Sequence, residues 1–121
     1  MPRSLKFDAE SLLPLPTAAF HILVALADGD RHGYAIMQDV AVGTGGRLKL
    51  NPGTLYTTIR RLLEQGLVTE LDERPDPEDD DERRRYYRLT DVGREVAKAE
   101  AARLQEALAF ARQAGLTPKR T

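Results

Sequence analysis

The sequence contains no cysteine and few of the other side chains that carry chemistry in small proteins. The absence of cysteine excludes disulfides, zinc–thiolate sites and thiol catalysis, and it fits a reducing compartment. His21 and His32 are the two histidines, and a lone histidine on an apolar helix is more often a core residue than a ligand. No glycine-rich phosphate loop, nucleophile elbow or triad pattern is present. We therefore expect no enzyme activity, no metal and no cofactor.

Long apolar runs are absent as well. No stretch approaches the ~20 apolar residues that a membrane-spanning helix needs, and residues 1–16 lack the apolar core of a secretory signal. The length of 121 residues suits one domain. These features predict a cytoplasmic protein without a membrane partner.

Charged residues are plentiful but unevenly distributed. The formal net charge is -1, which taken alone argues against a nucleic-acid partner. Eight of the 19 acidic side chains, but one of the 18 basic ones, lie in residues 72–82, so the rest of the chain holds 17 basic and 11 acidic side chains, a net of +6. Because attraction to DNA depends on where charge lies, the low total is weak evidence against DNA binding.

Apolar periodicity predicts three short helices, over residues 17–27, about 32–42 and 52–65. Thr17 is the expected N-cap of the first. Asn51 is the expected N-cap of the third, with proline in its first turn, and Gly66 is its expected end. The residues expected on the inward face of the second helix are Tyr34, Met37, Val40 and Ala41.

The second half of the chain predicts a hairpin followed by a long helix. Residues 67–74 and 83–89 show strand character and flank an acidic loop over 75–82. Thr90 is the expected cap of a helix that extends to about Ala114. Three helices, a two-stranded hairpin and a long helix form the layout of a mostly helical winged helix-turn-helix protein.

This layout predicts a division of the chain into four parts. We expect a flexible or partly docked N-terminal arm over residues 1–16 and a DNA-binding domain over 17–89. A C-terminal dimerisation helix over 90–115 and a tail over 116–121 complete the chain.

The third helix is the candidate recognition helix, because a helix-turn-helix places its second helix in the major groove. The face opposite its apolar stripe carries Thr54, Thr57, Thr58 and Arg61. Threonine hydroxyls suit phosphates and base edges, and arginine can clamp a phosphate or read guanine. Gly53 would let the helix N-terminus approach a phosphate closely. The alternative, that these are ordinary surface residues of an amphipathic helix, stays open at this point.

The returning strand supplies a second candidate contact. Arg83, Arg84 and Arg85 would neutralise DNA phosphates if the wing lies beside a groove. The alternative is that these arginines pair with the acidic residues 79–82 across the hairpin, and both could hold in part.

The long final helix carries a narrow apolar seam. Its members recur at 4-3-4-3 spacing, as in a coiled coil, and are Ala97, Ala101, Leu104, Leu108 and Ala111. The helix could pack on its own domain, lie on a membrane surface or pair with a second copy. Mixed charge on its polar face disfavours the membrane. Pairing is favoured, and a two-fold dimer predicts a palindromic operator.

Four linked motifs resemble the PadR family of bacterial regulators across roughly residues 15–95. These are His32-Gly33-Tyr34, Asn51-Pro52-Gly53-Thr54-Leu55-Tyr56, Arg61-Leu62 with Gly66-Leu67, and Arg84-Arg85-Tyr86-Tyr87-Arg88-Leu89-Thr90 with Gly93. A single C-terminal helix is similar to that of the smaller PadR subfamily.

The resemblance implies a homodimeric repressor joined through the final helix, with contributions from the first. For some relatives it implies release from DNA by a small aromatic or hydrophobic effector bound between the subunits. It gives the recognition role to Thr54, Tyr56, Thr57 and Arg61 and the wing role to Arg84 and Arg85. Tyr34 and Tyr87 are expected to be core residues that lock the helices against the wing.

The chain departs from the family pattern in three places. Asn51 stands where serine is usual, although both residues cap well. The acidic segment 75–82 replaces a shorter wing loop, and no tryptophan is present for the stacking pocket that some relatives use for drugs. The acidic wing favours an alternative function, a winged-helix protein–protein interaction module without DNA binding.

Overall fold

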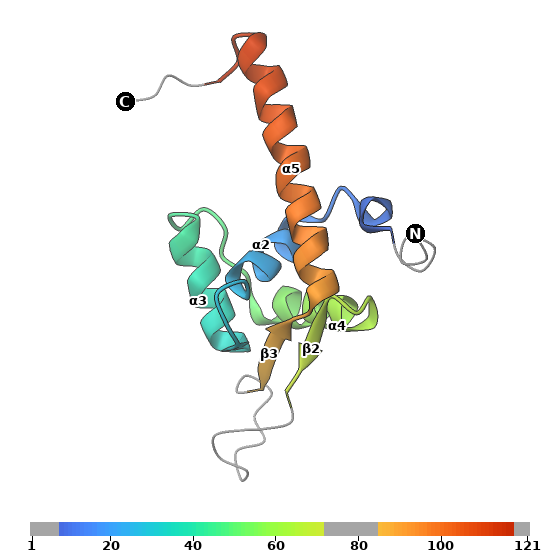
Figure 1. Ribbon diagram of the computed structural model, residues 1–121. Helices are drawn as coiled ribbons and strands as arrows, with labels where there is room; N and C mark the ends of the chain where they lie inside the picture. The colour runs from blue at the N-terminus through green and yellow to red at the C-terminus, as the bar shows by residue number, and fades with distance from the viewer. Residues whose placement is uncertain (1–7, 72–84, 118–121) are drawn as a thin grey trace.

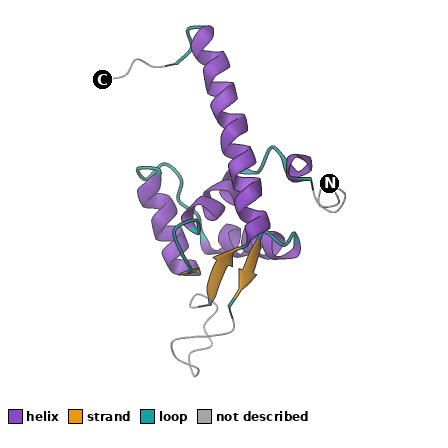
Figure 2. Ribbon diagram, viewed as in Figure 1, coloured by secondary structure: helices purple, strands orange, loops and turns teal. Residues whose placement is uncertain are grey.

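The computed structural model describes residues 8–71 and 85–117 and shows a helical body from which one long helix projects (Figure 1). The helices and strands are η1 (Ala9–Leu12), α2 (Thr17–Ala25), β1 (Arg31–His32), α3 (Gly33–Gly43), α4 (Pro52–Glu64), β2 (Val68–Glu70), β3 (Tyr86–Leu89) and α5 (Asp91–Gln113). The expected order of three short helices, a hairpin and a long helix is confirmed (Figure 2). The fold is a winged helix.

The core forms around α2, an almost wholly apolar helix that contacts α3, α4 and α5. Ile22 and Leu23 of α2 are fully buried, and so are Ile36 of α3, Leu55 of α4 and Val96 of α5. Each such side chain contributes roughly 1.5–3 kcal/mol by leaving water. One central helix therefore holds the other three in place.

Side-chain caps fix where α4 and α5 begin. Asn51 Oδ1 accepts from the Thr54 N–H at 2.8 Å at the start of α4. Thr90 Oγ1 accepts from the Gly93 N–H at 2.9 Å at the start of α5 and donates to the Gly66 carbonyl at 2.8 Å. Both expected caps are confirmed. The expected cap at Thr17 is wrong, because Thr17 is already the first residue of α2 and Pro16 precedes it without a side-chain hydrogen bond.

The sheet has a third strand that the sequence did not predict. The two-residue β1 pairs antiparallel with β3, which also pairs with β2, in the order β1-β3-β2. Two residues cannot show the alternation that identifies a strand. His32 then caps α3, its Nδ1 accepting from the Ala35 N–H at 3.1 Å.

The inward face of α3 agrees with the expected one in part: Val40 is buried as expected, Met37 and Ala41 are half-buried, and Tyr34 is not buried. The buried residues of the helix are Gly33, Ile36 and Val40, and Tyr34 is 51% exposed. The expected core role of Tyr34 is therefore wrong, because a helix that turns Ile36 and Val40 inward directs Tyr34 to solvent. Tyr87 of β3 is buried at 2% exposure, and its expected core role is confirmed.

The described part of the N-terminal arm is docked. The η1 segment packs against α5, and Leu15 is 9% exposed in the core. The alternative of a partly docked tail therefore holds for residues 8–16. Residues 1–7, the wing segment 72–84 and residues 118–121 lie outside the described residues.

A buried carboxylate ties this segment to α5. Glu100 is 2% exposed, and its two oxygens accept from Arg103 Nε at 2.7 Å and Nη2 at 3.0 Å. The hydrogen bonds from Arg103 lower the pKa of Glu100, burial opposes them, and the Arg103 charge and a hydrogen bond from the Leu15 backbone lower it further. The ionised carboxylate thus stabilises the docked arm.

Glu100→Gln should lower the free energy of unfolding at pH 7. Because the folded-state pKa lies below the ordinary value of 4.5, the ionised carboxylate stabilises the fold above that pH, and its contribution is lost as the pH falls through the folded-state value. Urea unfolding between pH 7 and pH 3 should show the difference from wild type shrinking in acid. Glu95→Gln, at an exposed position, is the control. If the free energy of unfolding of the two variants depends on pH in the same way, ionised Glu100 does not stabilise the fold.

Candidate nucleic-acid interface

The recognition candidate α4 separates an apolar face from a polar one. Leu55, Ile59 and Leu62 are buried along one side. Gly53, Thr54, Thr57 and Arg61, four of the predicted contact residues, are exposed. Thr58 and Tyr56 are half-buried. The helix therefore presents most, but not all, of the predicted residues to solvent.

Arg60 is an exposed residue of α4 that the sequence reasoning missed. Gly53, Thr57 and Arg60 are spaced i, i+4 and i+7, so they lie on the side directly opposite the buried stripe. Within residues 8–71 and 85–117, no carboxylate pairs with Arg60 or Arg61. A helical wheel centred opposite the buried residues would have identified Arg60.

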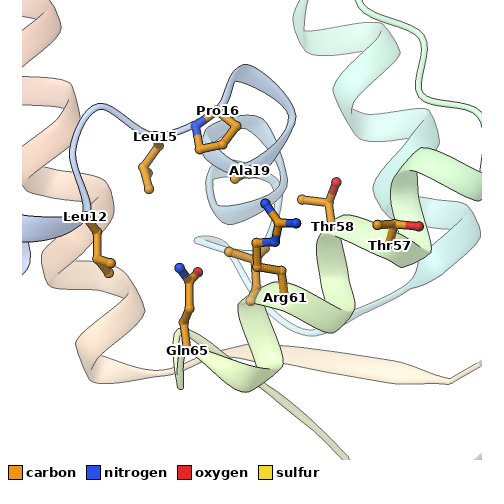
Figure 3. Close-up of a pocket in the computed structure, with 9 residues that line it drawn as sticks. Leu12, Leu15, Pro16, Ala19, Thr57, Thr58, Arg61 and Gln65 are labelled. Atoms are coloured by element: carbon orange, nitrogen blue, oxygen red, sulfur yellow. The ribbon is translucent and has the colours of Figure 1, made fainter.

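Arg61 and Thr58 lie at the edge of this face, beside the docked arm. With Thr57 and Gln65 they line one wall of a cavity of about 200 Å³, and Leu12, Leu15, Pro16 and Ala19 line the facing wall. Figure 3 shows Arg61 and Gln65 reaching from α4 toward the segment of Leu15 and Pro16. Arg61 and the docked arm therefore border the same cavity.

Tyr56 packs against the start of α3. A Cβ built on Gly33 would lie 2.8 Å from Tyr56 Cζ and 2.9 Å from its Cε1. Glycine at position 33 thus allows α3 and α4, the two helices of the helix-turn-helix, to approach closely.

The wing is described in part. Arg83 and Arg84 lie outside the described residues, and Arg85 is half-buried. Arg85 Nη1 is 3.6 Å from Glu70 Oε2 on the neighbouring strand segment. Arg85 thus pairs with an acidic residue, Glu70, of the neighbouring strand. The expected partners over 79–82 lie outside the described residues, so that alternative stays open.

The outer half of α5 projects away from the helical body (Figure 1). Every residue from 101 to 110 is exposed, among them Leu104 at 41% and Leu108 at 46%. Ala101 is exposed with them, and Ala97 and Ala111, at the two ends of the predicted seam, are half-buried. An apolar seam that the protomer leaves exposed is available for a second chain.

Two classes of site find no support among the described residues. No described helix is long and apolar enough to cross a bilayer. Among the same residues, no group of three or more histidine, aspartate or glutamate side chains could hold a metal ion.

The winged-helix fold with an exposed helix-turn-helix face defines a class of transcriptional regulators. The model of the transcriptional regulator PadR-like family matches residues 22–99. The chain belongs to this family, whose members are regulators rather than enzymes.

One curated protein is similar to this chain in sequence. A protein of Streptomyces fradiae, described as an uncharacterized 37.1 kDa protein in transposon TN4556, is 41% identical over 80 residues, which are 66% of this chain and 21% of that protein. The chain thus spans about a fifth of that relative's length.

Two solved structures share the fold. A PadR family regulator from Clostridium difficile R20291 has a TM-score of 0.66 and 21% identity, covering 81% of this chain and 97% of its own. Bacillus subtilis PadR, solved in complex with operator DNA, has a TM-score of 0.60 and 21% identity, covering 71% of this chain and 47% of its own.

Gly33→Ala should destabilise the protein by roughly 1–3 kcal/mol, because the new Cβ overlaps the Tyr56 ring. Gly43→Ala, at the last residue of the same helix, is the control: no atom lies within 4 Å of its Cβ position. This variant should not lower the free energy of unfolding, because the added methyl meets no neighbour. Chemical denaturation measures both. Equal effects at the two positions would disprove the packing contact, and Tyr56→Leu should rescue Gly33→Ala.

Proposed function

We propose that this protein is a DNA-binding transcriptional repressor that inserts α4 into the major groove. The observation that carries the proposal is the exposed polar face of α4. It combines small side chains with two cations, Arg60 and Arg61, that pair with no carboxylate in the described part of the chain. A groove about 12 Å wide admits such a helix. The same use of the fold is supported by Bacillus subtilis PadR, a structural neighbour solved with operator DNA.

The wing is the proposed backbone clamp. Strands β2 and β3 lie at the same end of the molecule as α4, away from the projecting half of α5 (Figure 1). Arg83 and Arg84 would extend the basic surface beside the groove, and Arg85 would support them through its pair with Glu70. Phosphate contacts of this kind make binding steeply salt-dependent.

A homodimer through α5 is the second part of the proposal. The exposed apolar seam suits a two-fold partner helix, and burying it would remove Leu104 and Leu108 from water. A two-fold dimer would present two copies of α4 about one helical turn of DNA apart, so the operator should be palindromic. We place this dimer in the cytoplasm, with the DNA.

Release from DNA by a small effector stays a prediction from the family resemblance. The resemblance places such a molecule between two subunits, and hence along α5 rather than in the 200 Å³ cavity beside Arg61.

The second candidate function is a protein-interaction module. The observation in its favour is the concentration of acidic residues over 72–82. A mobility-shift assay at low salt, with the DNA upstream of the protein's own gene, separates the two. Binding that weakens as salt rises supports the regulator, and no binding at the lowest salt supports the interaction module.

Arg61→Ala should weaken specific DNA binding by about 1–3 kcal/mol if the guanidinium reads a base. Arg60→Ala should weaken binding to all sequences and lower the salt slope by about 0.9 if it holds one phosphate. Fluorescence anisotropy over a salt series measures both effects. Lys98→Ala, which removes one positive charge from α5, is the control. If Arg60→Ala and Arg61→Ala weaken DNA binding no more than Lys98→Ala does, neither arginine belongs to the interface.

Replacing Leu104 and Leu108 with glutamate should dissociate the dimer, because the seam would then bury unpaired charge. Sedimentation velocity would report a monomer. Phe110→Glu is the matched control, since Phe110 is 77% exposed on the opposite face of α5 and should leave the dimer intact. A Leu104/Leu108 variant that stays dimeric would rule out the seam.

A further inference from the structure

A bidentate ion pair joins the wing to the turn that precedes α3. Arg88 of β3 donates from Nε to Asp30 Oδ1 at 3.1 Å and from Nη2 to Asp30 Oδ2 at 2.9 Å. Both carboxylate oxygens are engaged by one planar guanidinium, an arrangement that fixes direction as well as distance. The pair thus restricts how β3 can rotate about the turn.

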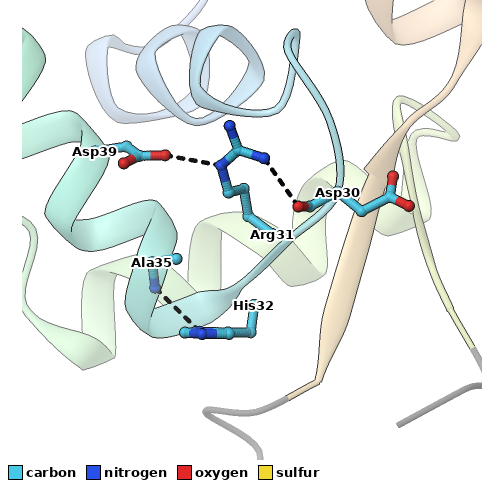
Figure 4. A network of polar contacts seen from close by, with 5 residues as sticks. All are labelled: Asp30, Arg31, His32, Ala35 and Asp39. Atoms are coloured by element: carbon cyan, nitrogen blue, oxygen red, sulfur yellow. Dashed lines mark hydrogen bonds and ion pairs between the residues drawn. The ribbon is translucent and has the colours of Figure 1, made fainter. Parts of the chain in front are cut away.

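The turn is itself anchored to α3. Arg31 Nε donates to Asp39 Oδ2 at 2.9 Å, and Arg31 Nη1 donates to the carbonyl oxygen of Asp30 at 3.0 Å (Figure 4). An uninterrupted series of polar contacts therefore runs from Asp39 of α3 through Arg31 and Asp30 to Arg88 of the wing. None of these side chains belongs to the apolar core.

Backbone pairing alone holds this edge of the wing weakly. The strand β1 has two residues, and its register places Arg31 opposite Tyr87 and His32 opposite Tyr86. Continuing that register by one step places Asp30 opposite Arg88. The ion pair thus extends this very short strand pairing by one residue pair. The rings of His32 and Tyr86 meet edge-on at the other end of the pairing, with their centroids 5.4 Å apart.

The pair fixes geometry more than it adds stability. The side chains of Arg88 and Asp30 are 57% and 33% exposed, and solvent-exposed pairs of this kind contribute little to the free energy of unfolding. The hydrogen bonds from Arg88 hold the pKa of Asp30 below its ordinary value against the opposing effect of burial, with the charges of Arg88 and Arg31 adding to the lowering. The carboxylate therefore stays ionised at neutral pH.

We propose that Asp30 is a positioning residue for DNA binding: its bidentate pair with Arg88 sets the orientation of the wing relative to α3 and α4. The inference rests on the proposed function, because it assumes that α4 and the wing contact the same duplex. Asp30 would thus support DNA binding although its negative charge repels the phosphates of the DNA.

The test compares Asp30→Asn with Asp28→Asn, which removes the same charge from an exposed position in the same turn. Anisotropy titrations with the upstream DNA over a salt series measure affinity and salt slope. Asp28→Asn should bind as well as wild type or slightly better. Asp30→Asn should bind more weakly, on the order of tenfold, with a slope lower by about 0.9 for each phosphate that the wing no longer neutralises.

Two further measurements separate positioning from a loss of fold. Asp30→Asn should unfold thermally close to wild type, since the pair is solvent-exposed. The double variant Asp30→Arg with Arg88→Asp should recover part of the affinity and of the salt slope, because it restores a bidentate ion pair between the same two positions.

Three results would overturn the proposal. Tighter binding by Asp30→Asn than by Asp28→Asn would mean that Asp30 competes with DNA for Arg88. Equal binding by the two variants would mean that the pair has no role. Wild-type protein that binds no DNA at low salt would overturn the proposed function itself, and this inference with it.

Discussion

The burial of α2 is the constraint on which the rest of the structure depends. This nine-residue helix carries fully buried Ile22 and Leu23 and touches α3, α4 and α5. It has little polar surface of its own, so it can be covered only if the other helices surround it. Once they do, α4 has a single buried side, and its remaining side faces solvent. The recognition face is thus a consequence of how the core closes.

Close approaches and short polar contacts then set the details of the DNA-facing end. Gly33 allows Tyr56 to pack between the two helices of the helix-turn-helix, and the pair of Asp30 with Arg88 ties the wing to the same helices. The helix α5 begins beside the end of α4, at the Thr90 cap, where a Cβ on Gly93 would meet the Leu67 backbone. Its C-terminal half projects from the body with the apolar seam exposed (Figure 1). The surface proposed for DNA and the seam proposed for a second copy therefore lie on different parts of one protomer.

Features fixed by local sequence could be predicted, and features fixed by tertiary neighbours could not. Asn51 and Thr90 act through hydrogen bonds to residues three positions away, so their caps and the helices that follow could be predicted from the chain. The strand β1 exists because β3 lies beside it, and the buried carboxylate of Glu100 depends on Arg103 and on an arm 85 positions earlier in sequence. Tyr34 was misplaced because the inward face of α3 is chosen by packing.

The central claim is that two copies of α4 read successive turns of one duplex face. Hydroxyl-radical footprinting of the wild-type protein on the DNA upstream of its gene tests it most directly. The account predicts two protected patches related by two-fold symmetry, with centres about 10 base pairs apart on the same side of the helix. A single unsymmetrical patch, or protection on opposite sides of the duplex, would contradict it.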